Sequence, residues 1–273
     1  MISIIHFLFT ILNSIPIIHV SNDDNYGTYH NIETIRISLL SIPLGKKIFY
    51  FLSKKRNCKK IELFKVIYFD IEQCRVSPEE VDEKVSNYEL YLKTTSPLQR
   101  EKQEEFLKIR IAESIGSLSS LHNKVSFYST IGLALFGFLG YLLTEIVNLK
   151  TFIYIKWWLF SFWSLSALYA LNLVFFIKAA IAVTSFNKSK FSTLRNNVKE
   201  TALLTAFYRD WYDITDAVRY HASLVKNIEK YLSYLIISCV LTWGILFIST
   251  NILTYSYEFC IVNFKKYPLN FIV

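Results

Sequence analysis

Glycine, proline and methionine are scarce in this chain of 273 residues, which contains 7, 5 and 1 of them. Hydrophobic residues make up 52% and aromatic residues 16% of the sequence, and the mean hydropathy is positive. This balance is unusual for a soluble domain and is typical of helices that cross a lipid bilayer. The composition therefore predicts a helical membrane protein.

Motifs that carry known chemistry are also missing. The sequence has no G-x-x-x-x-G-K-[ST], G-x-G-x-x-G, H-E-x-x-H or G-x-S-x-G segment. The cysteines form no C-x-x-C pair, and no histidine stands at metal-ligand spacing from a second histidine or cysteine. We therefore expect no enzyme activity, no cofactor and no metal. The residues concerned are Cys58, Cys74, Cys239 and Cys260, with His6, His19, His30, His122 and His221.

The net charge of +8 comes from 30 Lys and Arg residues, which lie mostly in 21–124 and 185–230. They are spread along these segments rather than gathered in one patch, which disfavours direct nucleic-acid binding. The positive-inside rule predicts that both segments are cytoplasmic. The connector after residue 148 and the tail, 254–273, then lie outside.

Three apolar runs are each near or above the ~20 residues that a bilayer core requires. They are 125–148, 157–184 and 231–253. A further apolar run, 1–20, carries no Lys or Arg, and we interpret it as an interfacial anchor or a weak fourth span rather than a cleaved signal. The expected class is an all-α membrane protein of three or four spans.

Small and polar residues indicate how the spans pack. Gly132, Gly137 and Gly140 would allow close helix approach in the first span. Ser164 and Ala167 would do so in the second, where Asn172 is predicted to bond across helices at mid-membrane depth.

Basic residues suggest contacts with lipid headgroups. Lys178 ends the second run and is expected to reach the headgroups. Lys46–Lys60 alternates bases and aromatics, so Lys54, Lys55 and Arg56 either contact anionic headgroups or form a solvated basic turn. Ile61–Phe69 is too short to assign to strand or helix.

Two Ser-Pro pairs, Ser77-Pro78 and Ser96-Pro97, are typical of helix starts. The second start leads to apolar residues at heptad spacing as far as Val125. A longer seam, which we expect to pack on that helix and to hold a partner, follows in 185–230. Its members are Leu204, Phe207, Trp211, Ile214, Val218, His221, Val225 and Ile228. His221 is either a pH-sensitive or register-setting core residue, or a partly exposed residue at the seam edge.

In its plan, 97–254 resembles the small membrane effectors of bacterial anti-phage systems that accompany retrons or cyclic-oligonucleotide signalling. Coiled-coil helices leave the membrane, and a hairpin of spans joins them. The resemblance implies abortive infection: a homo-oligomer is restrained by a cytoplasmic nucleoprotein or nucleotide-signalling complex and, once released, damages the inner membrane. A membrane scaffold that recruits a cytoplasmic partner, and a channel or transporter subunit, are the alternatives.

Overall fold

The computed structural model describes residues 7–9, 11–13, 17–22, 35–45, 47–56, 58, 60–68, 76–149, 153–182 and 201–266. The chain divides into two compact units. The first unit contains Met1–Tyr128 and Val174–Glu229, and the second contains Ser129–Leu173 and Lys230–Val273. Three long helices therefore contribute residues to both units.

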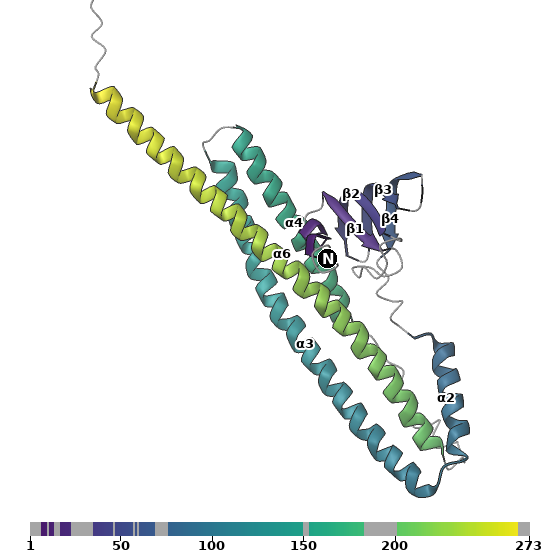
Figure 1. Ribbon diagram of the computed structural model, residues 1–273. Coiled ribbons are helices and arrows are strands. Elements are labelled where there is room, and N and C mark those ends of the chain that lie inside the picture. Colours follow the sequence, from purple (N-terminus) through teal and green to yellow (C-terminus); the bar gives the residue numbers. More distant parts are fainter. Residues whose placement is uncertain are drawn as a thin grey trace, which may run out of the picture. The chain divides into compact units, whose positions relative to one another are not determined.

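Helices make up most of the described chain (Figure 1). They are α2 (Pro78–Leu92), α3 (Pro97–Asn148), α4 (Ile153–Ile181) and α6 (Ala202–Lys266). Three of them, α3, α4 and α6, are long and apolar enough to cross a membrane. The chain therefore has the helices of a multi-pass membrane protein, as the apolar runs predict.

Both Ser-Pro pairs start helices. The Ser77 hydroxyl accepts a hydrogen bond from the Glu80 N–H at 3.2 Å, and Pro78 is the first residue of α2. At α3, Ser96 Oγ accepts from the Gln99 N–H at 3.4 Å, while Gln99 Oε1 accepts from the Ser96 N–H at 3.2 Å. These contacts use N–H groups that a first helical turn otherwise leaves without partners.

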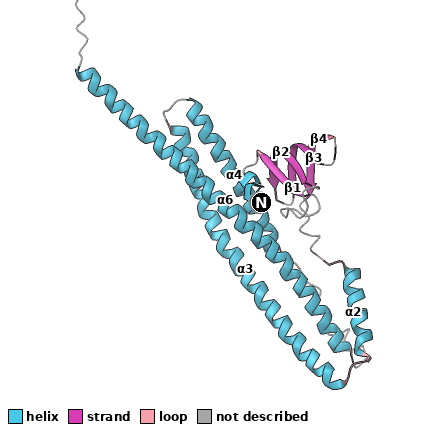
Figure 2. Ribbon diagram, in the orientation of Figure 1, coloured by secondary structure: helices cyan, strands magenta, loops and turns pink. Residues whose placement is uncertain are grey.

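The all-α prediction is wrong in one region, because residues 18–68 form a small antiparallel sheet (Figure 2). Its strands are β1 (Ile18–Asn22), β2 (Ile35–Leu44), β3 (Lys47–Lys55) and β4 (Ile61–Tyr68), in that spatial order. Each strand pairs with the next, and Gly45, with a φ of +60°, lies in the turn between β2 and β3. Glycine adopts that conformation without a Cβ clash.

The sheet exposes its apolar side chains and buries polar ones. On β2 the exposed residues are large and apolar, whereas Arg36, Ser38 and Ser41 are buried. The same holds on β3 and β4, where Ser53 is buried but apolar side chains are open to solvent. We call the exposed side the apolar face. Its residues are Ile37, Leu39, Leu40, Ile42, Leu44, Phe51, Ile61, Leu63, Phe64 and Val66.

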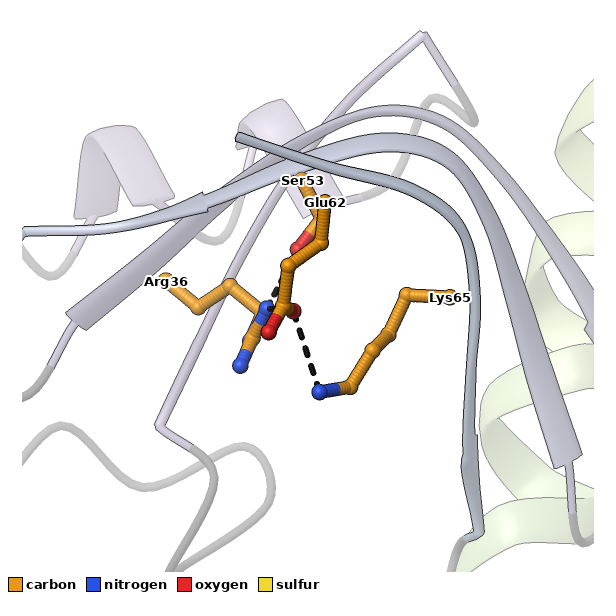
Figure 3. Close-up of polar contacts among 4 residues, drawn as sticks. All are labelled: Arg36, Ser53, Glu62 and Lys65. Atoms are coloured by element: carbon orange, nitrogen blue, oxygen red, sulfur yellow. Dashed lines mark hydrogen bonds and ion pairs between the residues drawn. The ribbon is translucent and has the colours of Figure 1, made fainter. Parts of the chain in front are cut away.

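On all three long strands, the alternation of buried and exposed side chains shifts by one residue at the same row. Leu40, Phe51 and Phe64 lie opposite one another between paired positions, and burial alternates in a register one residue later beyond the row. Leu40 and Phe64 have positive φ, of 49° and 52°. The Phe51 and Phe64 rings meet edge to face at 5.1 Å. The pairing register is the same on both sides of the row, and Figure 3 shows these strands strongly curved.

A polar network lies beneath the curved strands (Figure 3). The Arg36 guanidinium, only 4% exposed, donates to Ser53 Oγ and to Glu62 Oε2, each at 2.5 Å. Lys65 pairs with the same carboxylate at 3.0 Å. Hydrogen bonds from Lys65 and Arg36 lower the pKa of Glu62. Nearby, the Tyr50 hydroxyl lies 2.9 Å from His19 Nδ1.

The predicted segment boundaries need three corrections. Ile18–Asn22 belongs to β1, so 1–20 is not one spanning helix; its described residues before the strand, 7–9 and 11–13, are helical. The second apolar helix begins at Ile153 rather than at 157. Helix α6 continues to Lys266, well past the predicted end of the third span at 253. Residues 150–152 of the connector and residues 183–200 and 267–273 lie outside the described residues.

Candidate functional site

The seam joins α3 and α6 in the first unit through contacts such as Leu107 with Leu204 and His122 with His221. Five of the eight residues predicted for the α6 side are buried: Leu204, Ile214, His221, Val225 and Ile228. Phe207, Trp211 and Val218 are half-buried. The sequence reasoning missed Ala217, Tyr220 and Leu224, which are also buried and widen the apolar stripe to the breadth of an ordinary helix–helix contact. The partner-binding role of this seam remains a prediction.

His221 is a buried seam residue rather than an edge residue, since it is 2% exposed. Its ring meets the ring of His122 on α3 edge to face, with centroids 5.0 Å apart. It also contacts the Tyr220 ring at 5.6 Å. Among the described residues, no three His, Cys, Asp or Glu side chains are placed to hold a metal ion.

Helix α2 is held against this seam by an aromatic cluster. Leu92 of α2, Leu107 of α3 and Leu204 of α6 form a buried core. The Tyr88 ring stacks on Tyr208 with centroids 4.1 Å apart, and the Tyr88 hydroxyl donates to Gln103 Oε1 at 2.8 Å. We call this cluster the α2 clamp.

Packing around the α2 clamp shifts the pKa of two ionisable groups. Burial raises the pKa of Tyr88 to about 12, because the phenolate would lose its hydration. Burial also raises the pKa of Asp213 on α6. The charge of Arg209 opposes that rise, while the nearby carboxylates Asp210, Asp216 and Asp82 add to it. Arg209 itself forms an ion pair with Asp82 of α2.

A second polar contact joins α3 to α6 near the end of the first unit. The Tyr128 hydroxyl donates to Glu229 Oε1 at 2.7 Å, and Lys124 Nζ lies 4.0 Å from the same oxygen. Both helices continue from this contact into the second unit without interruption. The polar and aromatic residues here are of the kind found at membrane–water interfaces.

In the second unit each helix contributes a segment of membrane-spanning length. The segments of α3, α4 and α6 as far as Asn251 are each about 30 Å long, the thickness of a bilayer core. Their outward side chains are apolar, as Leu133, Trp157 and Val240 illustrate. Trp163 Nε1 of α4 donates to the Leu139 carbonyl of α3 at 3.0 Å.

Buried polar side chains of this bundle bond to their own helices. Ser166 Oγ donates to the Phe162 carbonyl at 3.0 Å, and Thr242 Oγ1 donates to the Ser238 carbonyl at 2.7 Å. Local bonds of this kind let hydroxyl groups lie in an apolar interior without a second partner. They favour a structural role for these side chains.

Comparison of the chain with protein-family models, with curated protein sequences and with solved structures finds no match.

The small residues predicted to pack the spans differ in their surroundings. A Cβ added at Gly137 or Gly140 would meet no atom within 4 Å, whereas Gly132 is buried. Ser164 is exposed and Ala167 half-buried, while Ser166 and Ala170 of the same helix are buried. The packing role of these residues stays a prediction.

Asn172 is buried, and it donates to the Leu168 carbonyl of its own helix at 2.9 Å. The bond across helices stays a prediction. The Tyr169 ring lies beside Tyr231 and Tyr234, which begin the third apolar run. Asn172, almost one turn further along α4, is therefore near the end of the apolar bundle rather than at its middle.

The four predicted headgroup contacts do not lie together. Lys54 pairs with Ile37 and Ile61, so it belongs to the apolar face, whereas Lys55 pairs with Arg36 on the other side. Arg56 follows β3, and its N–H donates to the Ile35 carbonyl. Lys178 is on α4, near the β2–β3 turn. Lys54 and Lys55 are therefore strand residues, whereas Arg56 lies in a turn in which the Cys58 N–H donates to the Lys55 carbonyl at 3.0 Å.

Proposed function

We propose that this chain is a membrane effector in which the first unit governs how the spans of the second unit pack. One observation carries the proposal: α3 and α6 run unbroken from the seam into the apolar segments. An α-helix resists bending because each turn is hydrogen-bonded to the next. A packed interface also tends to switch between discrete arrangements rather than to deform gradually. A change at the seam should therefore reach the spans.

The α2 clamp is the proposed point of control. It covers the start of α6 with a few aromatic contacts and an exposed ion pair, and exposed ion pairs contribute little stability. A cytoplasmic partner that competes for α2 would free this end of the seam. Following the resemblance, we propose a nucleoprotein or nucleotide-signalling complex as that partner.

The proposed outcome is loss of the inner-membrane barrier of a bacterium during phage infection, by an oligomer of released chains. The apolar outward surface of the bundle supports lipid contact, and its three spans are few for a substrate pathway. Membrane disruption is therefore favoured over transport.

Inducible expression in bacteria with a potential-sensitive dye tests this function. Tyr88→Ala should loosen the α2 clamp and speed depolarisation relative to the natural sequence. Leu90→Ala, at an exposed leucine of the same helix, is the matched control and should behave as the natural sequence does. An unchanged potential for all three chains, each present in the membrane fraction, would contradict the proposal. A co-purifying cytoplasmic protein would then favour the scaffold.

A further inference from the structure

The apolar face of the sheet requires an occupant, because ten large apolar side chains are open to solvent on one small sheet. Leu63, for example, is 61% exposed. Soluble proteins rarely expose an apolar patch of this extent unless it binds another surface. The buried side mixes polar residues such as Arg36 and Ser53 with apolar ones such as Ile48, whereas the exposed side is mainly apolar, as suits an apolar medium on the outside.

Bases accompany the apolar side chains on this face. Lys47 pairs with Leu44 at one end of β3, and Lys54 pairs with Ile37 at the other; both lysines are exposed. The described strands contain one acidic residue, Glu62, and its carboxylate is bound by Arg36 on the opposite side. The charge of the apolar face is therefore purely positive, which suits anionic lipid headgroups.

The sheet packs on the end of helix α4 that belongs to the same unit. Helix α4 has 29 residues and is about 43 Å long, whereas a bilayer core takes up about 30 Å, so part of the helix extends beyond a core. The β2–β3 turn packs on α4 near Phe175: a Cβ added at Gly45 would lie 3.0 Å from Phe175 Cβ.

A pocket of about 300 Å³ lies where the sheet meets α4. It is lined by Leu44 and Gly45 of the turn and by Phe175, Phe176 and Lys178 of the helix. Leu44 also belongs to the apolar face, so face and pocket are continuous. An apolar cavity with one lysine at its edge matches a phospholipid at the point where an acyl chain joins the glycerol, next to the phosphate group.

We propose that the apolar face of the sheet lies on the bilayer surface and binds anionic phospholipid, with Lys47, Lys54 and Lys178 contacting headgroups. The sheet then acts as an in-plane anchor beside α4, additional to the three candidate spans and independent of the proposed effector activity. A second copy of the chain is a poorer occupant. A two-fold interface presents the same patch twice and would bring the two sets of lysines towards each other.

Fluorescence quenching in vesicles tests this anchor on the full-length protein. The fluorophore NBD is attached at Leu63→Cys in a chain whose four native cysteines are replaced by serine, and the vesicles contain nitroxide-labelled phosphatidylcholine. Leu133→Cys in the second unit gives the signal of a lipid-exposed site, and Glu83→Cys on α2 gives that of a site in water. We expect quenching at Leu63 to approach that at Leu133. Ile42→Cys, also on the apolar face, repeats the measurement.

Quenching at Leu63 no greater than at Glu83 would overturn the proposal. Disulfide formation between two Leu63→Cys chains would then assign the face to a second copy.

A second experiment tests whether the apolar face requires anionic lipid. Each lysine near an anionic surface strengthens association about fivefold. Adding phosphatidylserine to the vesicles should therefore increase quenching at Leu63. The double substitution Lys47→Gln and Lys54→Gln should remove that increase, while Lys84→Gln on α2 should retain it. If phosphatidylserine has no effect on the natural sequence, anionic lipid is not the ligand of this face.

Discussion

The sheet and the helical seam belong to the same unit, yet they expose different kinds of side chain. The seam buries leucine, isoleucine and valine and presents charged residues outside, as a helix surrounded by water does. The sheet buries Val20, Ile35, Ile48 and Tyr50 together with an arginine, three serines and a histidine, and it presents leucine, isoleucine and phenylalanine outside. The proposed anchor accounts for this difference, because it places the exposed side of the sheet against lipid and leaves the seam helices in water.

The largest expected difference between the two regions comes from truncating one leucine in each. Leu224 is fully buried in the seam, and Leu224→Ala should lower the free energy of unfolding by about 2–5 kcal/mol through the cavity it leaves. Leu63→Ala on the apolar face should cost no more than about 0.5 kcal/mol in detergent. Thermal unfolding of both variants measures the difference. An equal loss of unfolding free energy in the two variants would mean that the apolar face is packed within the chain.

The buried arginine provides the next comparison. Arg36→Leu removes hydrogen bonds to Ser53 and to the Glu62 carboxylate, each worth about 1.5–3 kcal/mol when a charged group takes part. We expect faster hydrogen exchange in β2 and β3 and unchanged exchange in α6. Arg110→Leu, which removes an exposed pair with Glu113 on α3, is the control and should leave the sheet unaffected. Full protection of the sheet in Arg36→Leu would show that its polar core is dispensable.

The pH dependence of stability should have opposite signs in the two regions. Glu62 has a lowered pKa in the folded sheet, so its contribution is present above its unfolded pKa of about 4.3 and is lost as the pH falls through the folded value. Asp213 has a raised pKa in the seam. Its contribution to stability is complete below its unfolded pKa of about 3.9 and is lost as the pH rises through the folded pKa.

Asp213→Asn should therefore raise the melting temperature near pH 7 and have little effect near pH 3. Glu62→Gln should lower the melting temperature near pH 7, and this loss should shrink as the pH falls below the folded pKa of Glu62. Melting curves of both variants and the natural chain at the two pH values measure these shifts. A destabilising Asp213→Asn at neutral pH would show that its carboxylate is stabilised by charge rather than penalised by burial.

The smallest effect concerns the exposed ion pair between Asp82 and Arg209. A double-mutant cycle with Asp82→Asn and Arg209→Gln should give a coupling of about 0.2–1 kcal/mol, and salt should reduce it. A coupling well above this range would make the pair a principal part of the α2 clamp.

The helices could be predicted from sequence because their signals are local or periodic. Ser77-Pro78 and Ser96-Pro97 begin helices through contacts within four residues. The spacing of Leu204 to Ile228 identifies the packed side of α6 without reference to its partner. The three long apolar helices follow from composition alone.

The sheet was not predicted because the alternation of buried and exposed residues is interrupted on every long strand. At Leu40, Phe51 and Phe64 this alternation shifts by one position, so each strand shows two short patterns in place of one. Gly45 is a usable hairpin signal, but Pro43 just before it is disfavoured inside a strand and weakens that signal. The glycines of the first span illustrate a second limit of sequence reasoning. Small residues permit close packing without requiring it, and neighbouring side chains decide which face of a helix is used.

The proposed function requires above all that a change at the seam reaches the spans. Spin labels at Leu133 of α3 and Val240 of α6, both exposed in the second unit, report the distance between two spans of the reconstituted chain. Trp211→Asp places a charge in the seam and should shift or broaden that distance distribution, whereas Glu83→Gln, on the exposed side of α2, should leave it unchanged. An identical distribution in Trp211→Asp, with the seam shown to be open by hydrogen exchange, would contradict the coupling of the two units.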